Sequence, residues 1–232
     1  MNGNGITDFH SHILPGADHG SKNRETTKRQ LEILKSIGVE RVVATPHFYP
    51  QIDSVESFLE KRAAAVERLQ SIYDAKMPTV FPGAEVLVCP GIDHMQHLDK
   101  LCIPGTDVIL LEMPMSGWSA EIIETVRRIS ASGLVAVMAH IDRYKKTEIA
   151  KLSLECDRLL YQLNGSAVSG FLGKKRVNEL CSALPVACVG SDIHGADKKA
   201  AAELKSIWQH IEKKGINLSE CASTLLERAL KL

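Results

Sequence analysis

The chain has 232 residues, of which 44% are hydrophobic, and this length suits a single α/β domain spanning residues 1–232. Lysine plus arginine and aspartate plus glutamate number 28 each, and the resulting formal net charge of zero argues against nucleic acid as a partner, because duplex-binding proteins usually carry a basic excess. No apolar stretch approaches the ~18 residues that span a bilayer, which argues against membrane insertion.

Short runs rich in Val, Ile and Leu predict seven strands: Ile6–His10, Arg41–Thr45, Thr79–Glu85, Val108–Glu112, Leu134–His140, Arg158–Asn164 and Pro185–Ser191. Most of these runs are apolar throughout, which is typical of parallel strands buried on both faces. The segments between them predict helices at Thr26–Ile37, Asp53–Ala75, Ser119–Ser132, Glu148–Cys156, Lys174–Ala183, Ala196–Lys213 and Ser219–Leu230. A short helix is expected at Gly91–Leu101, with His94 and His97 on the surface. This alternation predicts a parallel sheet with helices outside it.

Each predicted strand ends in a polar side chain that can bind a metal ion or a phosphate. In chain order these are His10 with His12, His47, Glu85, Glu112, His140, Asn164, and Asp192 with His194. The ends of parallel strands converge on one face of a barrel, whereas an open doubly wound sheet would spread them along an edge. An open sheet would also usually carry a G-x-G-x-x-G loop, which this sequence lacks. We therefore predict a distorted, seven-stranded, TIM-like (β/α) barrel.

Nine side chains form a candidate metal site: His10, His12, His19, His47, Glu85, Glu112, His140, Asp192 and His194. His10 and His12 lie two apart on a strand, so their side chains face the same way. Burying three carboxylates in an apolar barrel is costly without counter-charge, and nearby arginines do not match them in number. We therefore expect two or three divalent cations. The nitrogen and oxygen ligands favour manganese, with iron and zinc as alternatives.

Clustered cations of this kind suit the hydrolysis of a phosphomonoester by a metal-bridging hydroxide. Arg143 follows His140 by three residues and is expected to bind the phosphate as a bidentate fork. Lys199, which follows the last predicted strand among other basic residues, is a second candidate for phosphate binding. With Arg143, we expect Glu85 and His47 to be essential for turnover.

Seven motifs run through nearly the whole chain in one order: Asp8–Gly20, Ala44–His47, Pro82–Glu85, Leu110–Pro114, Ala139–Tyr144, Gln162–Ser166 and Gly190–His194. They resemble the polymerase and histidinol phosphatase (PHP) superfamily. The resemblance is greatest to its bacterial metal-dependent protein-tyrosine phosphatase branch, from capsule and exopolysaccharide gene clusters. Two departures are that His19 stands where this branch usually has Asp, and that Lys198 and Lys199 stand where it tends to have an arginine.

The resemblance implies a distorted barrel that holds up to three metals, in which Glu85 bridges metals and Arg143 holds the phosphate. It also implies removal of phosphate from phosphotyrosine in the tail of a membrane-associated tyrosine autokinase that controls capsular or exopolysaccharide synthesis. The six cysteines are scattered without a C-x-x-C pair, and the first residues show no signal-peptide pattern, so we expect a cytoplasmic protein.

Two alternative activities stay open from the sequence. A small-molecule phosphatase of the histidinol-phosphate type would use the same metal site. A metal amidohydrolase also begins with His-x-His on a barrel strand. A non-enzymatic binding module would have lost ligands, yet every expected position is filled. A cysteine-based phosphatase is excluded because none of the six cysteines has an arginine six residues later.

Overall fold

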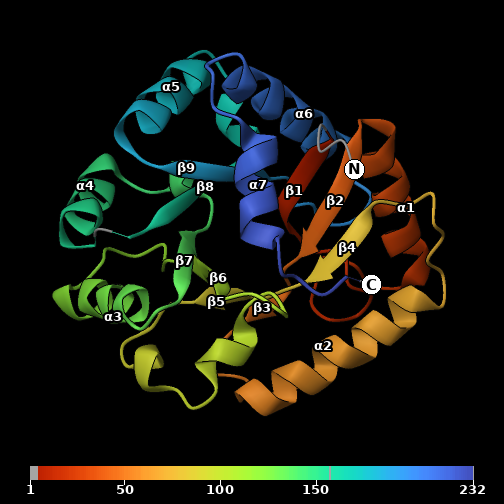
Figure 1. The fold of residues 1–232 in the computed structure, drawn as a ribbon, viewed down its shortest axis with the longest axis horizontal. Helices are drawn as coiled ribbons and strands as arrows, with labels where there is room; N and C mark the ends of the chain where they lie inside the picture. The colour runs from red at the N-terminus through yellow and green to blue at the C-terminus, as the bar shows by residue number, and fades with distance from the viewer. Residues whose placement is uncertain (1–4, 157, 232) are drawn as a thin grey trace.

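Parallel strands form the centre of the molecule and helices surround them (Figure 1). The computed structural model describes residues 5–156 and 158–231. The described residues form nine strands: β1 (Ile6–Ser11), β2 (Val39–Ala44), β3 (His47–Phe48), β4 (Thr79–Pro82), β5 (Glu85–Leu87), β6 (Val108–Glu112), β7 (Val135–Met138), β8 (Leu160–Asn164) and β9 (Val186–Gly190). Every strand pair is parallel, which confirms the predicted α/β class.

One of the seven predicted strands is split in two and one short strand, β3, was not predicted, which accounts for the nine. The strand predicted at Arg41–Thr45 stops at Ala44, before Pro46, which has no N–H to donate to a ladder, and the chain resumes as β3. The strand predicted at Thr79–Glu85 breaks at Gly83 into β4 and β5. One sheet therefore has the order β1-β2-β4 and the other β3-β5-β6-β7-β8-β9.

The two breaks lie at the same level and connect the two sheets. The Gly83 N–H donates to the Ala44 carbonyl (2.7 Å), and the Glu85 N–H donates to the Pro46 carbonyl (3.0 Å). Beyond the breaks, β3 and β5 pair with His47 opposite Glu85. The bend thus sets two predicted site residues side by side at the start of the second sheet.

The described residues also form seven α-helices: α1 (Arg24–Ser36), α2 (Val55–Gln70), α3 (Ala120–Ala131), α4 (Lys146–Glu155), α5 (Gly173–Ala183), α6 (Lys198–Glu212) and α7 (Leu218–Leu226). Short 3-10 turns occur at η1 (Ile92–His94), η2 (Leu98–Leu101), η3 (Ile141–Arg143) and η4 (Gly165–Val168). The side chains of Asn23, Ser54, Ser119 and Asp197 accept hydrogen bonds from first-turn N–H groups and so fix the starts of four helices. Within the described ranges, no helix has the length and apolarity needed to cross a bilayer.

Three predicted helices differ from the observed ones by more than two residues. The helix predicted at Asp53–Ala75 ends at Gln70, and the one predicted at Ser219–Leu230 ends at Leu226. The helix predicted at Gly91–Leu101 is replaced by η1 and η2, because Gly91 (φ 82°) and His97 (φ 64°) both adopt left-handed backbone that a continuous helix does not allow.

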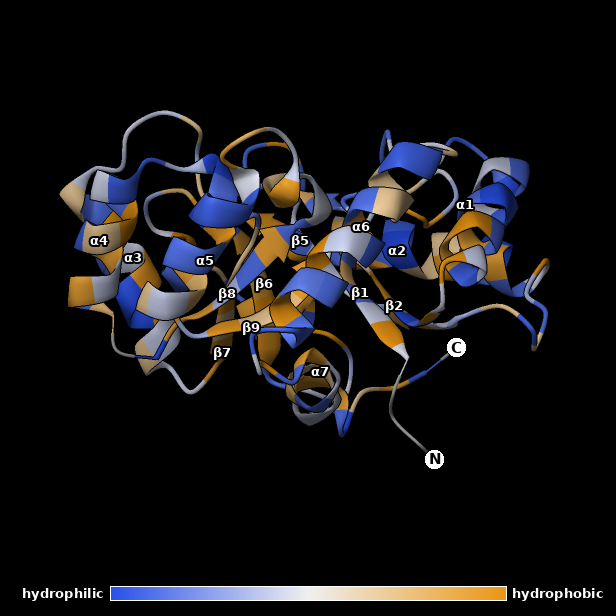
Figure 2. Cartoon of the chain, turned by 90° about the horizontal axis from the view of Figure 1, so that it is seen from above, coloured by the Kyte–Doolittle hydropathy of each residue, from blue (hydrophilic) through white to orange (hydrophobic). Residues whose placement is uncertain are grey.

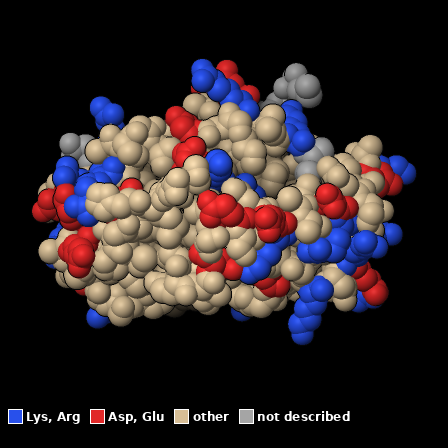
Figure 3. Space-filling model, turned by 90° about the horizontal axis from the view of Figure 1, so that it is seen from below, with Lys and Arg blue, Asp and Glu red and all other residues tan. Residues whose placement is uncertain are grey.

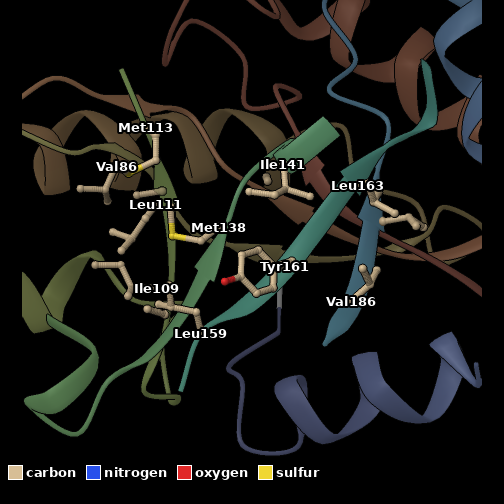
Figure 4. Packing of buried hydrophobic residues seen from close by; sticks show 14 of the residues in the cluster. Val86, Ile109, Leu111, Met113, Met138, Ile141, Leu159, Tyr161, Leu163 and Val186 are labelled. Carbon is tan, nitrogen blue, oxygen red and sulfur yellow. The ribbon is translucent and has the colours of Figure 1, made fainter. Parts of the chain in front are cut away.

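The hydrophobic core has an inner and an outer layer, because side chains alternate along each strand. On β6, Ile109 and Leu111 belong to the outer cluster, together with residues of other strands such as Met138 and Leu163 (Figure 4). Val108 and Leu110 instead join an interior cluster that helix α7 completes. Figure 2 shows this pattern as apolar strands enclosed by helices with hydrophilic outer faces.

Helix α7 lies across the amino-terminal ends of the first strands. Arg41, near the start of β2, donates through Nη1 to the Ser223 hydroxyl (2.7 Å). The helix also contributes Ala222, Leu225 and Leu226 to the interior cluster. Because α7 covers the amino-terminal ends of the strands, a functional site is expected at their carboxyl ends.

Candidate metal centre

Glu85 lies at the centre of the predicted site, surrounded by imidazoles from the end of β1, the start of β3 and the residues after β7. Its Oε2 atom is 3.2 Å from His10 Nε2, 3.3 Å from His12 Nε2 and 2.9 Å from His47 Nδ1. Its Oε1 atom is 2.9 Å from His140 Nε2. The Glu85 side chain is only 1% exposed, so these four rings form its immediate surroundings.

Two further carboxylates flank this centre on opposite sides. Glu112, at the end of β6, places Oε1 3.6 Å from His140 Nε2 and Oε2 4.0 Å from His47 Nδ1. Asp192, which follows β9, places Oδ1 3.3 Å from His12 Nε2 and 3.5 Å from His194 Nδ1. The chain therefore collects donors at one place from the carboxyl ends of β1, β6, β7 and β9 and from the first residues of β3 and β5.

The donor atoms form four overlapping groups of three that could each hold a metal ion, with all atoms of a group within 4.8 Å of one another: His12–His47–His194, His10–Glu85–His140, His10–His12–Asp192 and His47–Glu85–Glu112. Eight of the nine predicted ligands belong to at least one group. Because the groups share members, they suit neighbouring cations bridged by common ligands better than one isolated ion.

The orientation of these atoms also fits cations. His47 Nδ1 and Glu85 Oε2 are buried and 2.9 Å apart, yet neither makes a hydrogen bond in the described structure. Two atoms that lie this close without forming a hydrogen bond are typical of two ligands that bind the same ion. The donors are nitrogen and oxygen only, which suits divalent first-row metals rather than a thiolate site.

The charges of the cluster shift the pKa values of its members strongly. Burial alone would lower the pKa of His12, but the neighbouring carboxylates of Asp18, Asp192 and Glu85 raise it well above 6.5. Burial would raise the pKa of Glu85, but His10, His12 and His140 hold it well below the usual range. The pKa of Glu112 is raised, by burial and by the charge of Glu85. Positive charge is thus required here, whether protons or metal ions supply it.

Asp18 is a site residue that our sequence analysis did not identify. Its Oδ2 atom accepts a 2.6 Å hydrogen bond from His12 Nδ1 and a 3.2 Å hydrogen bond from the His47 N–H. Its Oδ1 atom accepts from the Gly20 N–H (2.9 Å). A carboxylate on one ring nitrogen of a histidine fixes the tautomer and leaves the other nitrogen free for a metal. The signal available in the sequence was its place beside His19 in the Asp8–Gly20 motif.

Two polar side chains of β8 make contacts with residues of the site. The Gln162 Oε1 atom accepts from the His140 N–H (2.7 Å) and lies 3.2 Å from His10 Nδ1. Asn164, which the sequence placed among the polar strand ends, donates through Nδ2 to Asp192 Oδ2 (3.0 Å). His140 (φ 32°) and Asp192 (φ 52°) both have left-handed backbone, a costly conformation for residues other than glycine. Contacts of this kind hold such residues in place at functional sites.

The remaining predicted residues lie around the cluster or farther away. Arg143, in η3, forms an ion pair with Asp192 and is 41% exposed, so its guanidinium reaches the edge of the cluster. His19 is exposed and belongs to no group of three among the described residues, although its ring centroid is 4.6 Å from that of His194. Lys199 is exposed on the first turn of α6, with Nζ 3.7 Å from Glu203 Oε1. No contact between described residues joins Lys199 to the cluster.

Comparison with known proteins gives consistent matches over nearly the whole chain. A family model described as capsular polysaccharide synthesis, CpsB/CapC, matches residues 6–228. The tyrosine-protein phosphatase CpsB of Streptococcus pneumoniae is 30% identical over 214 residues, which cover 84% of this chain and 85% of that protein.

Solved structures share the fold. A chain from the crystal structures of YwqE from Bacillus subtilis and CpsB from Streptococcus pneumoniae, described as unique metal-dependent tyrosine phosphatases, matches with a TM-score of 0.76 at 21% identity and covers 97% of this chain and 96% of its own. An amidohydrolase from Mycoplasma synoviae matches with a TM-score of 0.51 at 12% identity, covering 99% of this chain and 88% of its own. At these identities the matches show a common fold, a barrel-like α/β architecture. Together with the family model they confirm the resemblance inferred from the motifs: the chain belongs to the CpsB/CapC family of capsular polysaccharide synthesis.

Proposed function

We propose that this protein is a metal-dependent tyrosine phosphatase of capsular or exopolysaccharide synthesis. The observation that carries the proposal is the convergence of four histidines on buried Glu85, flanked by Glu112 and Asp192, with the Arg143 guanidinium beside them. The 30% identical relative is named a tyrosine-protein phosphatase, which supports this activity over the small-molecule phosphatase and amidohydrolase alternatives.

The residues divide the work of phosphoester hydrolysis among them. The metal ligands would be His10, His12, His47, Glu85, Glu112, His140, Asp192 and His194, with His19 at the edge. Two or three divalent cations bound there, manganese first among the candidates, would lower the pKa of a bound water and neutralise phosphoryl oxygens. Glu85 holds the centre by contacting four imidazoles at once. Arg143, oriented by Asp192, would bind the phosphate through two N–H groups.

The substrate and setting follow from the family. We propose that the phosphotyrosine belongs to the tail of a membrane-associated tyrosine kinase and that the protein acts in the cytoplasm, where its six cysteines would stay reduced. Figure 3 shows one face of the molecule, on which lysine and arginine side chains are interspersed with aspartate and glutamate. This face gives no support to a nucleic-acid substrate, which a continuous basic surface would favour.

The proposal is tested by comparing hydrolysis of a phosphotyrosine peptide with hydrolysis of histidinol phosphate while bound metal is measured. We expect turnover of the peptide with Mn²⁺, loss of turnover with EDTA, and recovery when Mn²⁺ is restored. Glu85→Gln should bind less metal and be inactive, whereas the matched surface change Glu25→Gln on α1 should behave like the wild type. Turnover that resists EDTA, or a clear preference for histidinol phosphate, would contradict the proposal.

A further inference from the structure

An aromatic side chain that the sequence analysis did not single out stands at the metal centre. Tyr49 follows β3 by one residue and lies two residues beyond His47. Its ring stacks on the His47 imidazole, with centroids 5.1 Å apart and an angle of 17° between the planes. The ring is partly exposed, and its hydroxyl makes no hydrogen bond to another described residue. His47 therefore covers one face of Tyr49, and part of the ring remains exposed.

The surroundings of Tyr49 place it on the inner side of the site. The ring lies against His47, whose Nδ1 atom is 2.9 Å from Glu85 Oε2 and 4.0 Å from Glu112 Oε2. It thus presents a flat apolar surface among charged groups, on the β3 side of the cluster, whereas Arg143 and Asp192 lie on the β7 and β9 side.

We propose that Tyr49 is a specificity-determining residue whose ring packs against the aromatic group of an aryl phosphate. This inference rests on the proposed phosphatase function. In phosphotyrosine the phenyl ring is attached directly to the bridging oxygen, so it must lie within a few ångströms of a phosphate bound over the cluster. Aromatic rings gain from offset stacked or edge-to-face packing. An alkyl phosphate has no ring to place there, and therefore gains nothing from Tyr49.

Binding of two non-hydrolysable probes tests this directly. Calorimetric dissociation constants for phenylphosphonate and methylphosphonate are measured on Mn²⁺-loaded wild type, Tyr49→Leu and Tyr49→Phe. We expect Tyr49→Leu to weaken the preference for phenylphosphonate by about two- to tenfold, the size of a typical aromatic pair. Tyr49→Phe, which keeps the ring, should retain the preference. Ile52→Ala, a change at an exposed residue of the same loop, is the matched control and should also retain it.

Turnover and metal content separate the possible causes. The ratio of kcat/KM for phosphotyrosine to that for histidinol phosphate should fall in the same proportion in Tyr49→Leu, mainly through KM. Equal weakening of both phosphonates, or less bound manganese, would mean that Tyr49 acts only by supporting His47 and would overturn the proposal. If Tyr49→Phe loses the preference for phenylphosphonate as fully as Tyr49→Leu, the hydroxyl and not the ring is responsible, and the proposal is overturned. If the wild type binds phenylphosphonate more tightly than methylphosphonate but hydrolyses neither phosphotyrosine nor histidinol phosphate, the proposed phosphatase function is wrong and the proposed aryl-binding role of Tyr49 is retained.

Discussion

Asp18→Asn removes one charge from the metal centre while it keeps the shape of the side chain. In the wild type this carboxylate holds two of the proposed ligands, His12 through its ring and His47 through its backbone N–H. An asparagine could still accept one of these hydrogen bonds, but it would no longer favour the His12 tautomer that leaves Nε2 free for a metal ion. We therefore expect the fold to survive and metal affinity to fall.

The pKa of Asp18 shows how strongly the site favours its charged form. Burial would raise the pKa of Asp18, but the hydrogen bond and charge of His12 and two backbone N–H groups lower it from 3.8 to about 2. A pKa difference of this size corresponds to about 2.5 kcal/mol, and solvent screening of the partly exposed carboxylate reduces this to about 2 kcal/mol. That free energy is about thirtyfold in an equilibrium constant. For metal affinity we expect the 10- to 100-fold loss that is typical when a partner of a metal-bound histidine is removed.

The assay is equilibrium dialysis of purified wild type and Asp18→Asn against Mn²⁺ at pH 7. Asp74→Asn, at an exposed carboxylate after α2, is the matched control and should bind manganese as the wild type does. Urea unfolding should show that the variant remains folded. Unchanged affinity in Asp18→Asn, or an equal loss in Asp74→Asn, would refute the assignment of Asp18 as the residue that orients His12.

Three further changes test separate parts of the site. Arg143→Ala should slow turnover by about 10²-fold while bound metal stays constant, because the contact with the phosphate is lost whereas Asn164 still holds Asp192; loss of metal would instead make Arg143 structural. In Gly190→Ala the new Cβ would lie 2.4 Å from His10 Cβ, so urea unfolding should show a loss of about 1–3 kcal/mol together with weaker metal binding. Burial raises the pKa of Asp8 to about 6, above its unfolded value of 3.8, so its contribution to stability is present below pH 4 and is lost as pH rises through 6. Asp8→Asn should therefore raise the free energy of unfolding of the metal-stripped protein by about 3 kcal/mol at pH 7 relative to the wild type and leave it unchanged at pH 4.

Most of the site residues that the sequence could predict lie at the ends of the predicted strands. Buried parallel strands have a recognisable composition, and their ends must meet in space, so the convergence of His10, Glu85, Glu112, His140 and Asp192 could be expected without knowing any loop. The breaks at Pro46 and Gly83 were not predicted, because an apolar run does not reveal where a strand changes sheets. That change is nevertheless what pairs His47 with Glu85.

Loop residues were harder to predict, because their positions depend on the path of the chain rather than on periodicity. Asp18 reaches His12 only because the chain after β1 turns back at Gly16 (φ 70°), whose N–H donates to the Ser21 carbonyl. Lys199 illustrates the opposite case. Its position after the last strand suggested phosphate binding, but Asp197 caps α6 there and the lysine side chain extends toward Glu203, one turn along the helix. Its role in phosphate binding stays a prediction.

Charge balance links the site to a measurable event. Glu85, Glu112 and Asp192 lie together although the whole chain has a net charge of zero, and Arg143 pairs with only one of them. Burial would lower the pKa of His10, but Glu85 and Asp192 raise it above 6.5, and the pKa of His12 is raised further. Protons on these rings therefore offset the carboxylates before a cation binds. Since a ring nitrogen cannot hold a proton and a metal ion at once, binding of Mn²⁺ at pH 7 should release about one or two protons per chain. Calorimetry in two buffers of different ionisation enthalpy measures this number, and binding without proton release would show that the imidazoles around Glu85 are not the ligands.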